Sequence, residues 1–193
     1  MSVLASLCGI DEAGRGPWAG PVCAGAVILG PGALPDGLTD SKKLSAARRQ
    51  TLVPAIKHAA LAWGLGWASA EEIDALNIRQ ATHLAMRRAV KAMERVPELA
   101  LVDGNDLPAG LPCPGRTIIK GDLTEPAISA ASILAKTARD ALMEEMDTRH
   151  PGYGFAAHKG YGTAAHKAAL TRLGPCAIHR KSFAPVRAAT RAA

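Results

Sequence analysis

The chain is organised around the stretch Gly9-Ile10-Asp11-Glu12-Ala13-Gly14-Arg15-Gly16-Pro17. An apolar run over 7–10 enters this stretch and a second apolar run, Val22 to Leu29, leaves it, which predicts two strands joined by a turn. Buried carboxylates are costly unless a cation or hydrogen-bond donors compensate them. Asp11 and Glu12 therefore indicate a nearby metal ion or substrate cation, and the alternative for this pair alone is a solvated hairpin turn.

Two further acids follow predicted strands. One apolar strand ends at Asp103, and Asp122 comes directly after a strand predicted over 116–120. Ligand sites in open α/β sheets lie beyond the strand ends, so we expect these acids to converge with Asp11 and Glu12. Side chains alternate along a strand, so Asp11 and Glu12 face opposite sides of a regular strand. The sequence leaves open whether the turn begins at Glu12 or the longer side chain of Glu12 reaches round the strand.

The rest of the chain has the pattern of an α/β protein. We expect a strand over 61–68 and helices over 46–60, 70–96, 126–149 and 163–173. Asn77 falls inside the second of these helices. After residue 173 we expect an irregular basic tail that is frayed over 186–193. The whole chain, 1–193, is expected to form one domain, with a basic and helical C-terminal region over about 151–185.

The composition fits a soluble globular protein. The 193 residues are 48% hydrophobic, which is enough for one domain with a substantial core. No stretch approaches the ~20 apolar residues of a membrane span, and the short apolar start lacks a basic leader. The four cysteines are scattered and form no Cys-x-x-Cys pair. We therefore expect a cytoplasmic protein that does not associate with membranes.

The net charge of +6 is concentrated at the C-terminal end. Residues 151–193 contain seven Lys or Arg and no Asp or Glu, whereas residues 1–150 hold 16 basic and 17 acidic side chains. A basic end beside a body with strand-end acids is typical of a polyanion-binding surface next to a metal site. Charge that serves only solubility is the alternative on this observation alone.

The acids also indicate which metal ions the site prefers. Four carboxylates without a cluster of Cys or His suit oxygen-preferring ions such as Mg²⁺ or Mn²⁺ rather than zinc. Together with the basic end, they indicate phosphodiester cleavage by two ions ~4 Å apart, which activate water and stabilise the leaving oxygen. This reasoning identifies a class of chemistry but no particular substrate.

The motifs of the chain strongly resemble those of ribonuclease HII over residues 7 to about 185. They are Gly9 to Val22, Asp40-Ser-Lys-Lys-Leu-Ser45, Val102-Asp-Gly104, Lys120-Gly-Asp122, Ser129-Ala-Ala-Ser-Ile-Leu-Ala-Lys136, Arg139-Asp140 and His158-Lys-Gly-Tyr-Gly-Thr163. Several of these motifs are long enough to be specific individually. The resemblance implies a ribonuclease H-like α/β fold, with a five-stranded mixed sheet flanked by helices and a helical C-terminal part.

The resemblance also implies an activity and its catalytic residues. It implies an endonuclease that hydrolyses the RNA strand of RNA/DNA hybrids and cuts 5′ of single ribonucleotides in duplex DNA, as in ribonucleotide and primer removal. The products would carry a 3′-hydroxyl and a 5′-phosphate. The catalytic and metal-binding carboxylates implied are Asp11, Glu12, Asp103 and Asp122, with Mg²⁺ or Mn²⁺ as cofactor and two ions at catalysis.

The substrate-binding residues follow from the same resemblance. Gly14, Arg15 and Gly16 match the loop that senses the ribose 2′-hydroxyl, and glycines let backbone groups approach that hydroxyl closely. Tyr161 matches the tyrosine packed on the following deoxyribose, and the alternative is a buried tyrosine with a satisfied hydroxyl. The other expected substrate contacts are Lys42, Lys43, Asn77, Ser132, Lys136, Arg180 and Lys181.

Two other sets of polar residues receive a structural interpretation. Asp140 follows Arg139 inside a predicted helix, where an Arg-Asp pair is usually a structural ion pair, so we leave Asp140 outside the catalytic set. His158, His166 and His179 lack metal-ligand spacing, and we expect them to be phosphate contacts or satisfied surface groups.

The alternatives are a type HIII ribonuclease and a non-catalytic nucleic-acid-binding protein. Type HIII enzymes usually carry an extra N-terminal domain and a lysine where this chain has Arg15, whereas only ten residues precede Asp11 here. A binding-only protein has no need of converging acids that repel phosphate. We expect nucleic acid as the partner and a monomeric protein, and no clamp-binding motif after Phe183 supports a protein partner.

Overall fold

The computed structural model describes residues 6–32 and 34–191. Its centre is a five-stranded sheet with the strand order β3-β2-β1-β4-β5. The strands are β1 (Leu7–Ala13), β2 (Val22–Leu29), β3 (Ala60–Ala68), β4 (Leu99–Asp103) and β5 (Gly115–Ile118). β2 is antiparallel to β1 and β3, whereas β4 runs parallel to β1 and β5. The expected mixed sheet of a ribonuclease H-like fold is confirmed.

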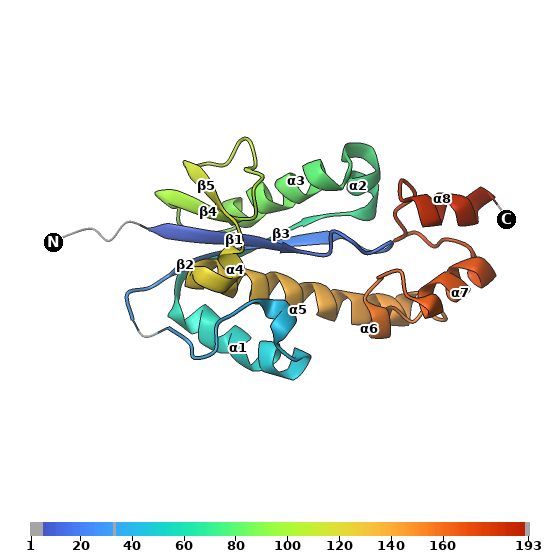
Figure 1. The fold of residues 1–193 in the computed structure, drawn as a ribbon, viewed down its shortest axis with the longest axis horizontal. Helices are drawn as coiled ribbons and strands as arrows, with labels where there is room; N and C mark the ends of the chain where they lie inside the picture. The colour runs from blue at the N-terminus through green and yellow to red at the C-terminus, as the bar shows by residue number, and fades with distance from the viewer. Residues whose placement is uncertain (1–5, 33, 192–193) are drawn as a thin grey trace.

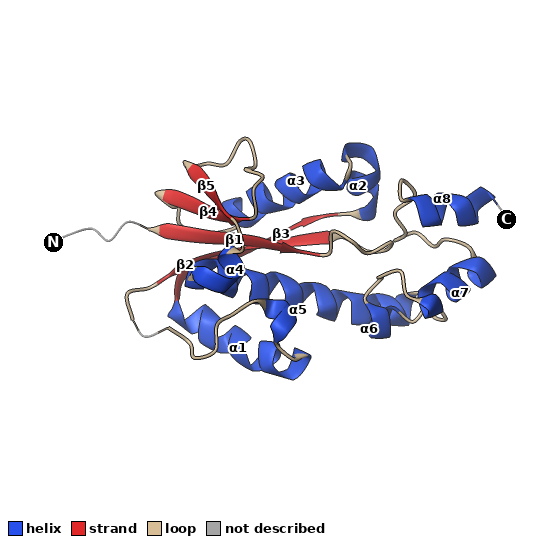
Figure 2. Cartoon of the chain, in the orientation of Figure 1, coloured by secondary structure: helices blue, strands red, loops and turns tan. Residues whose placement is uncertain are grey.

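Helices cover both faces of this sheet (Figures 1 and 2). In chain order they are η1 (Ser41–Lys43), α1 (Ala46–Ala59), α2 (Ala70–Leu76), α3 (Ile78–Lys91), α4 (Gly121–Thr124), α5 (Pro126–Arg149), α6 (Phe155–His158), α7 (Ala164–Leu173) and α8 (Ala184–Arg191). α2 and α3 lie on one face and α1, α4 and α5 on the other, while α6 to α8 lie beyond one end of the sheet (Figure 1).

Glycines in the sheet let the two long helices approach its backbone. A Cβ atom on Gly9 would lie 2.1 Å from the carbonyl carbon of Ala127 in α5, and one on Gly66 would lie 2.0 Å from the carbonyl oxygen of Ala85 in α3. Any larger residue would push these helices away from the strands. The close approach seats α5, which carries several of the predicted site residues, directly against β1.

The expected long helix over 70–96 is wrong, because the structure divides it at Asn77. This residue has a φ of 70°, which ends α2, and its side-chain oxygen accepts a hydrogen bond of 3.1 Å from the backbone N–H of Gln80 to cap α3. An Asn is among the residues that best tolerate positive φ and that best cap a helix. The apolar periodicity continues across the break and therefore conceals it.

Two smaller expectations also need correction. β5 ends at Ile118, and Asp122 lies in the short helix α4 rather than directly at a strand end. The region after residue 173 is not wholly irregular, because Ala184–Arg191 forms α8, which covers much of the stretch expected to fray. Among the described residues, all cysteines are free and no helix has both the length and the apolar character needed to cross a membrane.

Candidate active site

β1 continues through both acids of the opening motif, so no turn begins at Glu12. Asp11 pairs with Gly25 of β2, and Glu12 pairs with Ala24. Cross-strand partners point to the same face of a sheet, and a Cβ on Gly25 would meet the carbonyl of Ala131 in α5. The Asp11 side chain therefore faces α5, and regular alternation directs Glu12 to the face covered by α3.

The other two predicted carboxylates lie beside this pair. The parallel register matches Ile10 of β1 with Val102 of β4, which makes Asp11 and Asp103 neighbours at the carboxyl ends of adjacent strands. The backbone N–H of Asp122 donates a hydrogen bond of 3.3 Å to Asp103 Oδ1. The topology thus brings all four sequence-predicted acids to one end of β1 and β4.

The carboxylates destabilise one another's charges. Asp11 is 6% exposed, and burial together with repulsion from Glu12 and Asp103 raises its pKa well above the ordinary value. Burial also raises the pKa of Glu12, against the opposing attraction of Arg15. Burial and the charge of Asp103 raise the pKa of Asp122. A group of desolvated acids of this kind favours the binding of a cation.

Lys42 is a cation within reach of this group. Burial lowers its pKa, but the attraction of Asp11, Asp40 and Asp122 outweighs burial and raises the pKa above the usual value for lysine. Lys42 lies in η1, whose first turn is capped by the Asp40 side chain through a hydrogen bond of 2.8 Å to the backbone N–H of Lys42. This turn therefore presents a lysine to the acids.

The carboxylates also fit divalent metal ions. Within residues 6–32 and 34–191, no three Asp, Glu, His or Cys side chains are arranged so that they could hold a metal ion by themselves. Mg²⁺ usually takes only one or two protein carboxylates and completes its shell with water and substrate phosphate. An all-oxygen donor set whose negative charges repel one another suits this mode of binding.

The loop after β1 lies beside the predicted tyrosine. A Cβ atom on Gly16 would lie 3.6 Å from the Tyr161 ring, and Tyr161 is 42% exposed. Gly14 has a φ of 95°, and a Cβ there would lie 2.0 Å from Nε of Arg139. Glycine is therefore required at position 14 for both conformation and space. Arg15 extends back toward the acids, with its Nη1 3.5 Å from Glu12 Oε1.

Arg180 does not lie where the sequence placed it. Its side chain is completely buried and donates hydrogen bonds to the carbonyl oxygens of Gly14 at 2.6 Å, Arg15 at 2.8 Å and Gly20 at 2.9 Å. The expectation of a direct phosphate contact is therefore wrong for this conformation. Arg180 instead fixes the backbone of the loop that carries Gly14 and Arg15.

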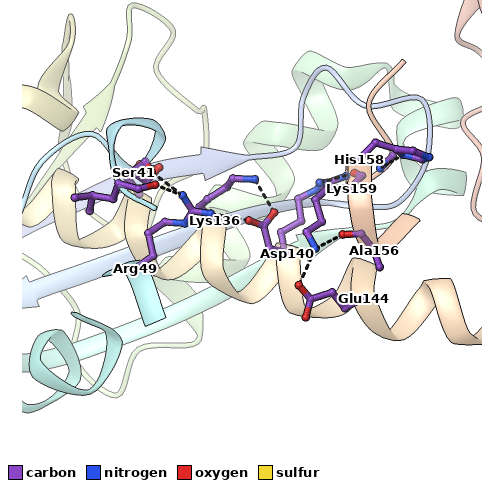
Figure 3. A network of polar contacts seen from close by, with 12 residues as sticks. Ser41, Arg49, Lys136, Asp140, Glu144, Ala156, His158 and Lys159 are labelled. Carbon is purple, nitrogen blue, oxygen red and sulfur yellow. Dashed lines mark hydrogen bonds and ion pairs between the residues drawn. The ribbon is translucent and has the colours of Figure 1, made fainter. Parts of the chain in front are cut away.

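Several other predicted substrate contacts also have partners within the protein. The Ser132 hydroxyl lies 2.8 Å from that of Ser41, and Lys136 Nζ donates to Asp140 Oδ1 at 2.6 Å. Asp140 forms ion pairs, and its partners are Lys136 and Arg49 rather than the adjacent Arg139 (Figure 3). Lys43 and Lys181 are exposed, and Asn77 occupies the break between α2 and α3.

The expected surface histidines are largely internal. His166 and His179 are 0% and 1% exposed, and their Nε2 atoms lie 3.1 Å apart. His166 Nδ1 also bonds the carbonyl oxygen of Tyr161 at 2.9 Å, and His158 stacks on His166 with ring centroids 4.4 Å apart. This cluster links the final segment of the chain to the backbone of Tyr161.

Sequence reasoning missed a charged cluster beside Glu12 and Asp103. The carboxylate of Asp106 accepts hydrogen bonds from Arg79 at 2.6 and 2.7 Å and lies 2.9 Å from His83 Nε2. These side chains line a small cavity of about 80 Å³ together with the two acids. The closeness of Asp106 to Asp103 in the chain was the one available signal.

Known proteins resemble this chain in both sequence and fold. The family model described as Ribonuclease HII matches residues 8–186. A "Ribonuclease HII" from Hyphomonas neptunium is 62% identical over 205 residues and covers 99% of both chains. The ribonuclease H2 from Pyrococcus horikoshii OT3 has a TM-score of 0.82 at 23% identity, covering 96% of this chain and 97% of that chain, which concerns the fold. A chain of the PCNA:RNase HII complex from Archaeoglobus fulgidus has a TM-score of 0.71 at 26% identity, covering 91% and 92%.

Proposed function

The chain belongs to the ribonuclease HII family, and we propose that it cuts duplex DNA on the 5′ side of single embedded ribonucleotides as well as the RNA strand of hybrids. Family membership makes it an endoribonuclease with ribonuclease H activity on nucleic acid. It also sets aside the type HIII and binding-only alternatives. The finer substrate specificity is what the proposal adds.

The observation that carries the proposal is that Gly16, in the loop that follows the acids of β1, lies beside the Tyr161 ring. A 2′-hydroxyl both donates and accepts hydrogen bonds, so backbone N–H and C=O groups of the loop over 14–16 can distinguish ribose from deoxyribose. The exposed Tyr161 ring is placed to pack on the sugar that follows. A site that recognises one ribose followed by one deoxyribose would recognise an RNA-to-DNA junction.

The carboxylates Asp11, Glu12, Asp103 and Asp122 would hold the divalent ions on which this family depends. When bound there, Mg²⁺ or Mn²⁺ would supply the charge that activates water and stabilises the leaving oxygen. The protein keeps Asp11 and Glu12 desolvated at the end of β1, beside Asp103 at the end of β4, which strengthens their attraction for cations. Lys42 and Arg15 flank them and can contact substrate phosphate.

The basic C-terminal region supports the binding of a long polyanion. Residues 151–193 carry seven basic and no acidic side chains, and exposed lysines such as Lys181 can contact phosphates without reading the sequence. We propose that the protein acts as a monomer. A structural neighbour has been solved in a complex with PCNA, but cleavage of the substrates named above needs no such partner.

Cleavage mapping tests this proposal directly. The substrate is a DNA duplex with one internal ribonucleotide, compared with an all-DNA duplex and a continuous RNA/DNA hybrid in Mg²⁺ or Mn²⁺. We expect a single cut 5′ of the ribonucleotide, with a 3′-hydroxyl and a 5′-phosphate, and no cut in DNA. Cleavage of the hybrid alone would refute the junction specificity, and undiminished cleavage after chelation would refute the metal requirement.

A further inference from the structure

The turn η1 that presents Lys42 to the acids is tied to the rest of the protein at both of its ends. Arg49 of α1 directs one nitrogen, Nη1, at the carbonyl oxygens of Ser41 at 3.0 Å and Leu44 at 2.7 Å. These two residues bracket Lys42 and Lys43. A single guanidinium nitrogen therefore closes the turn that carries the two lysines.

The second nitrogen of this guanidinium joins the turn to α5. Arg49 Nη2 donates to Asp140 Oδ2 at 3.0 Å, while Lys136 Nζ occupies Oδ1 of the same carboxylate at 2.6 Å (Figure 3). Arg49 and Asp140 are 8% and 9% exposed, so water does little to weaken their attraction. Asp140 thus fixes the orientation of Arg49 from a helix 91 residues away in the chain.

A further hydrogen bond places the turn next to the catalytic end of β1. The hydroxyls of Ser41 and Ser132 are 2.8 Å apart and buried. Ser132 lies close enough to the carboxylate of Asp11 to oppose the rise in the Asp11 pKa. The same helix therefore lies beside Asp11 at Ser132 and holds η1 through Asp140 and Arg49. Movement of η1 relative to α5 changes the distance between Lys42 and the acids.

We infer that Arg49 and Asp140 are positioning residues, which hold Lys42 at the carboxylates where substrate phosphate and divalent ions meet. The inference rests on the proposed function, because it assigns these residues a role in the same site. In the proposed function, Lys42 is the residue that contacts substrate phosphate beside the carboxylates. Arg49 and Asp140 act on catalysis only through the turn.

A double-mutant cycle tests this role in the full chain. The variants are Arg49→Lys, Lys42→Ala and their combination, with cleavage of the single-ribonucleotide duplex followed in saturating Mg²⁺. A lysine at position 49 keeps the positive charge beside Asp140 but lacks the fork that reaches both the carboxylate and the turn. We expect Arg49→Lys to lower kcat about tenfold with a smaller change in KM, and to lower kcat less than about twofold when Lys42 is already alanine.

Two acid-to-amide changes on α5 provide the matched comparison. Asp140→Asn turns a donor toward Arg49 or Lys136 and should reproduce the loss of kcat, again only when Lys42 is present. Glu145→Gln removes an exposed ion pair with Arg149 on the same helix and should leave kinetics unchanged in both backgrounds. Equal losses with and without Lys42 would show a general structural role and overturn the inference.

Amide hydrogen exchange gives a result that does not depend on activity. The N–H groups of Lys43 and Leu44 bond the carbonyls of Asp40 and Ser41 within η1. We expect Arg49→Lys and Asp140→Asn to accelerate exchange at these amides about tenfold, with little change at Gly174 after α7. Unchanged exchange in η1 would overturn the inference while leaving the proposed function intact. A parent enzyme that cuts neither substrate would overturn both.

Discussion

Replacing Arg180 by lysine should destabilise the protein and increase the mobility of the loop over 14–16, which is proposed to recognise the ribose. Arg180 donates three hydrogen bonds of 2.6 to 2.9 Å to backbone carbonyls, and two of these belong to Gly14 and Arg15. A lysine can keep about one of them because its single nitrogen lacks the planar fork of arginine.

The expected loss follows from this count. A hydrogen bond to a charged group contributes roughly 1.5–3 kcal/mol, so the loss of two predicts a decrease of at least about 3 kcal/mol in the free energy of unfolding. For a domain of this size, the melting temperature should fall by about 6 to 12 °C. The KM for a single-ribonucleotide duplex should rise, while affinity for an all-DNA duplex should stay nearly constant.

Thermal unfolding and steady-state cleavage measure these two effects. Arg172→Lys is the matched control, because Arg172 is exposed and donates one hydrogen bond of 3.0 Å to the carbonyl of Gly152. Its replacement should cost no more than about 0.5 kcal/mol. An Arg180→Lys variant that melts within 2 °C of the parent, a limit set at roughly a quarter of the expected shift, would refute the reasoning.

Three other predictions follow from burial and packing. In metal-free buffer at neutral pH, Asp11→Asn should raise the melting temperature, because it removes a buried carboxylate whose pKa is raised in the folded protein. The parent should gain stability as falling pH protonates Asp11, and the variant should lack this gain. Burial lowers the pKa of His166. Burial, together with the charge of the neighbouring His166, lowers the pKa of His179 to about 4. Their contribution to stability should be complete above about pH 6.5 and decline toward pH 4, and His179→Gln should flatten this part of the unfolding profile. Tyr161→Ala should impair cleavage at a single ribonucleotide more than cleavage of a continuous hybrid, and equal losses in parallel assays would remove its role in junction reading.

The acids were predictable because their signal is local. A buried strand followed by a carboxylate is visible in the sequence, and the strand-end rule for α/β sheets brings Asp11 and Asp103 together. Whether Glu12 begins a turn was not predictable, since the answer depends on β1 continuing its pairing with β2 as far as Ala13. The resemblance to a family supplied the roles that pattern alone leaves open.

The misplaced residues share a different cause. Arg180 appears in the sequence as part of a basic surface, but its acceptors are carbonyls some 165 residues away, which only the folded backbone brings near. Arg49 likewise meets Asp140 across 91 residues. At Asn77 the helical periodicity persists through a positive φ, so the apolar pattern carries no sign of the break. Long-range polar contacts have no periodic signal comparable to that of apolar residues.

The central claim is that the strand-end carboxylates hold divalent ions for cleavage at a ribonucleotide. Its most direct test is the single-turnover cleavage rate of Asp103→Asn on a single-ribonucleotide duplex at saturating Mg²⁺, with an unchanged circular dichroism spectrum as proof of folding. Asparagine keeps the shape of the side chain but removes the charge. We predict a loss of at least roughly a hundredfold, as expected when several kcal/mol of charge stabilisation is removed. Near-parental cleavage by the folded variant would contradict the account.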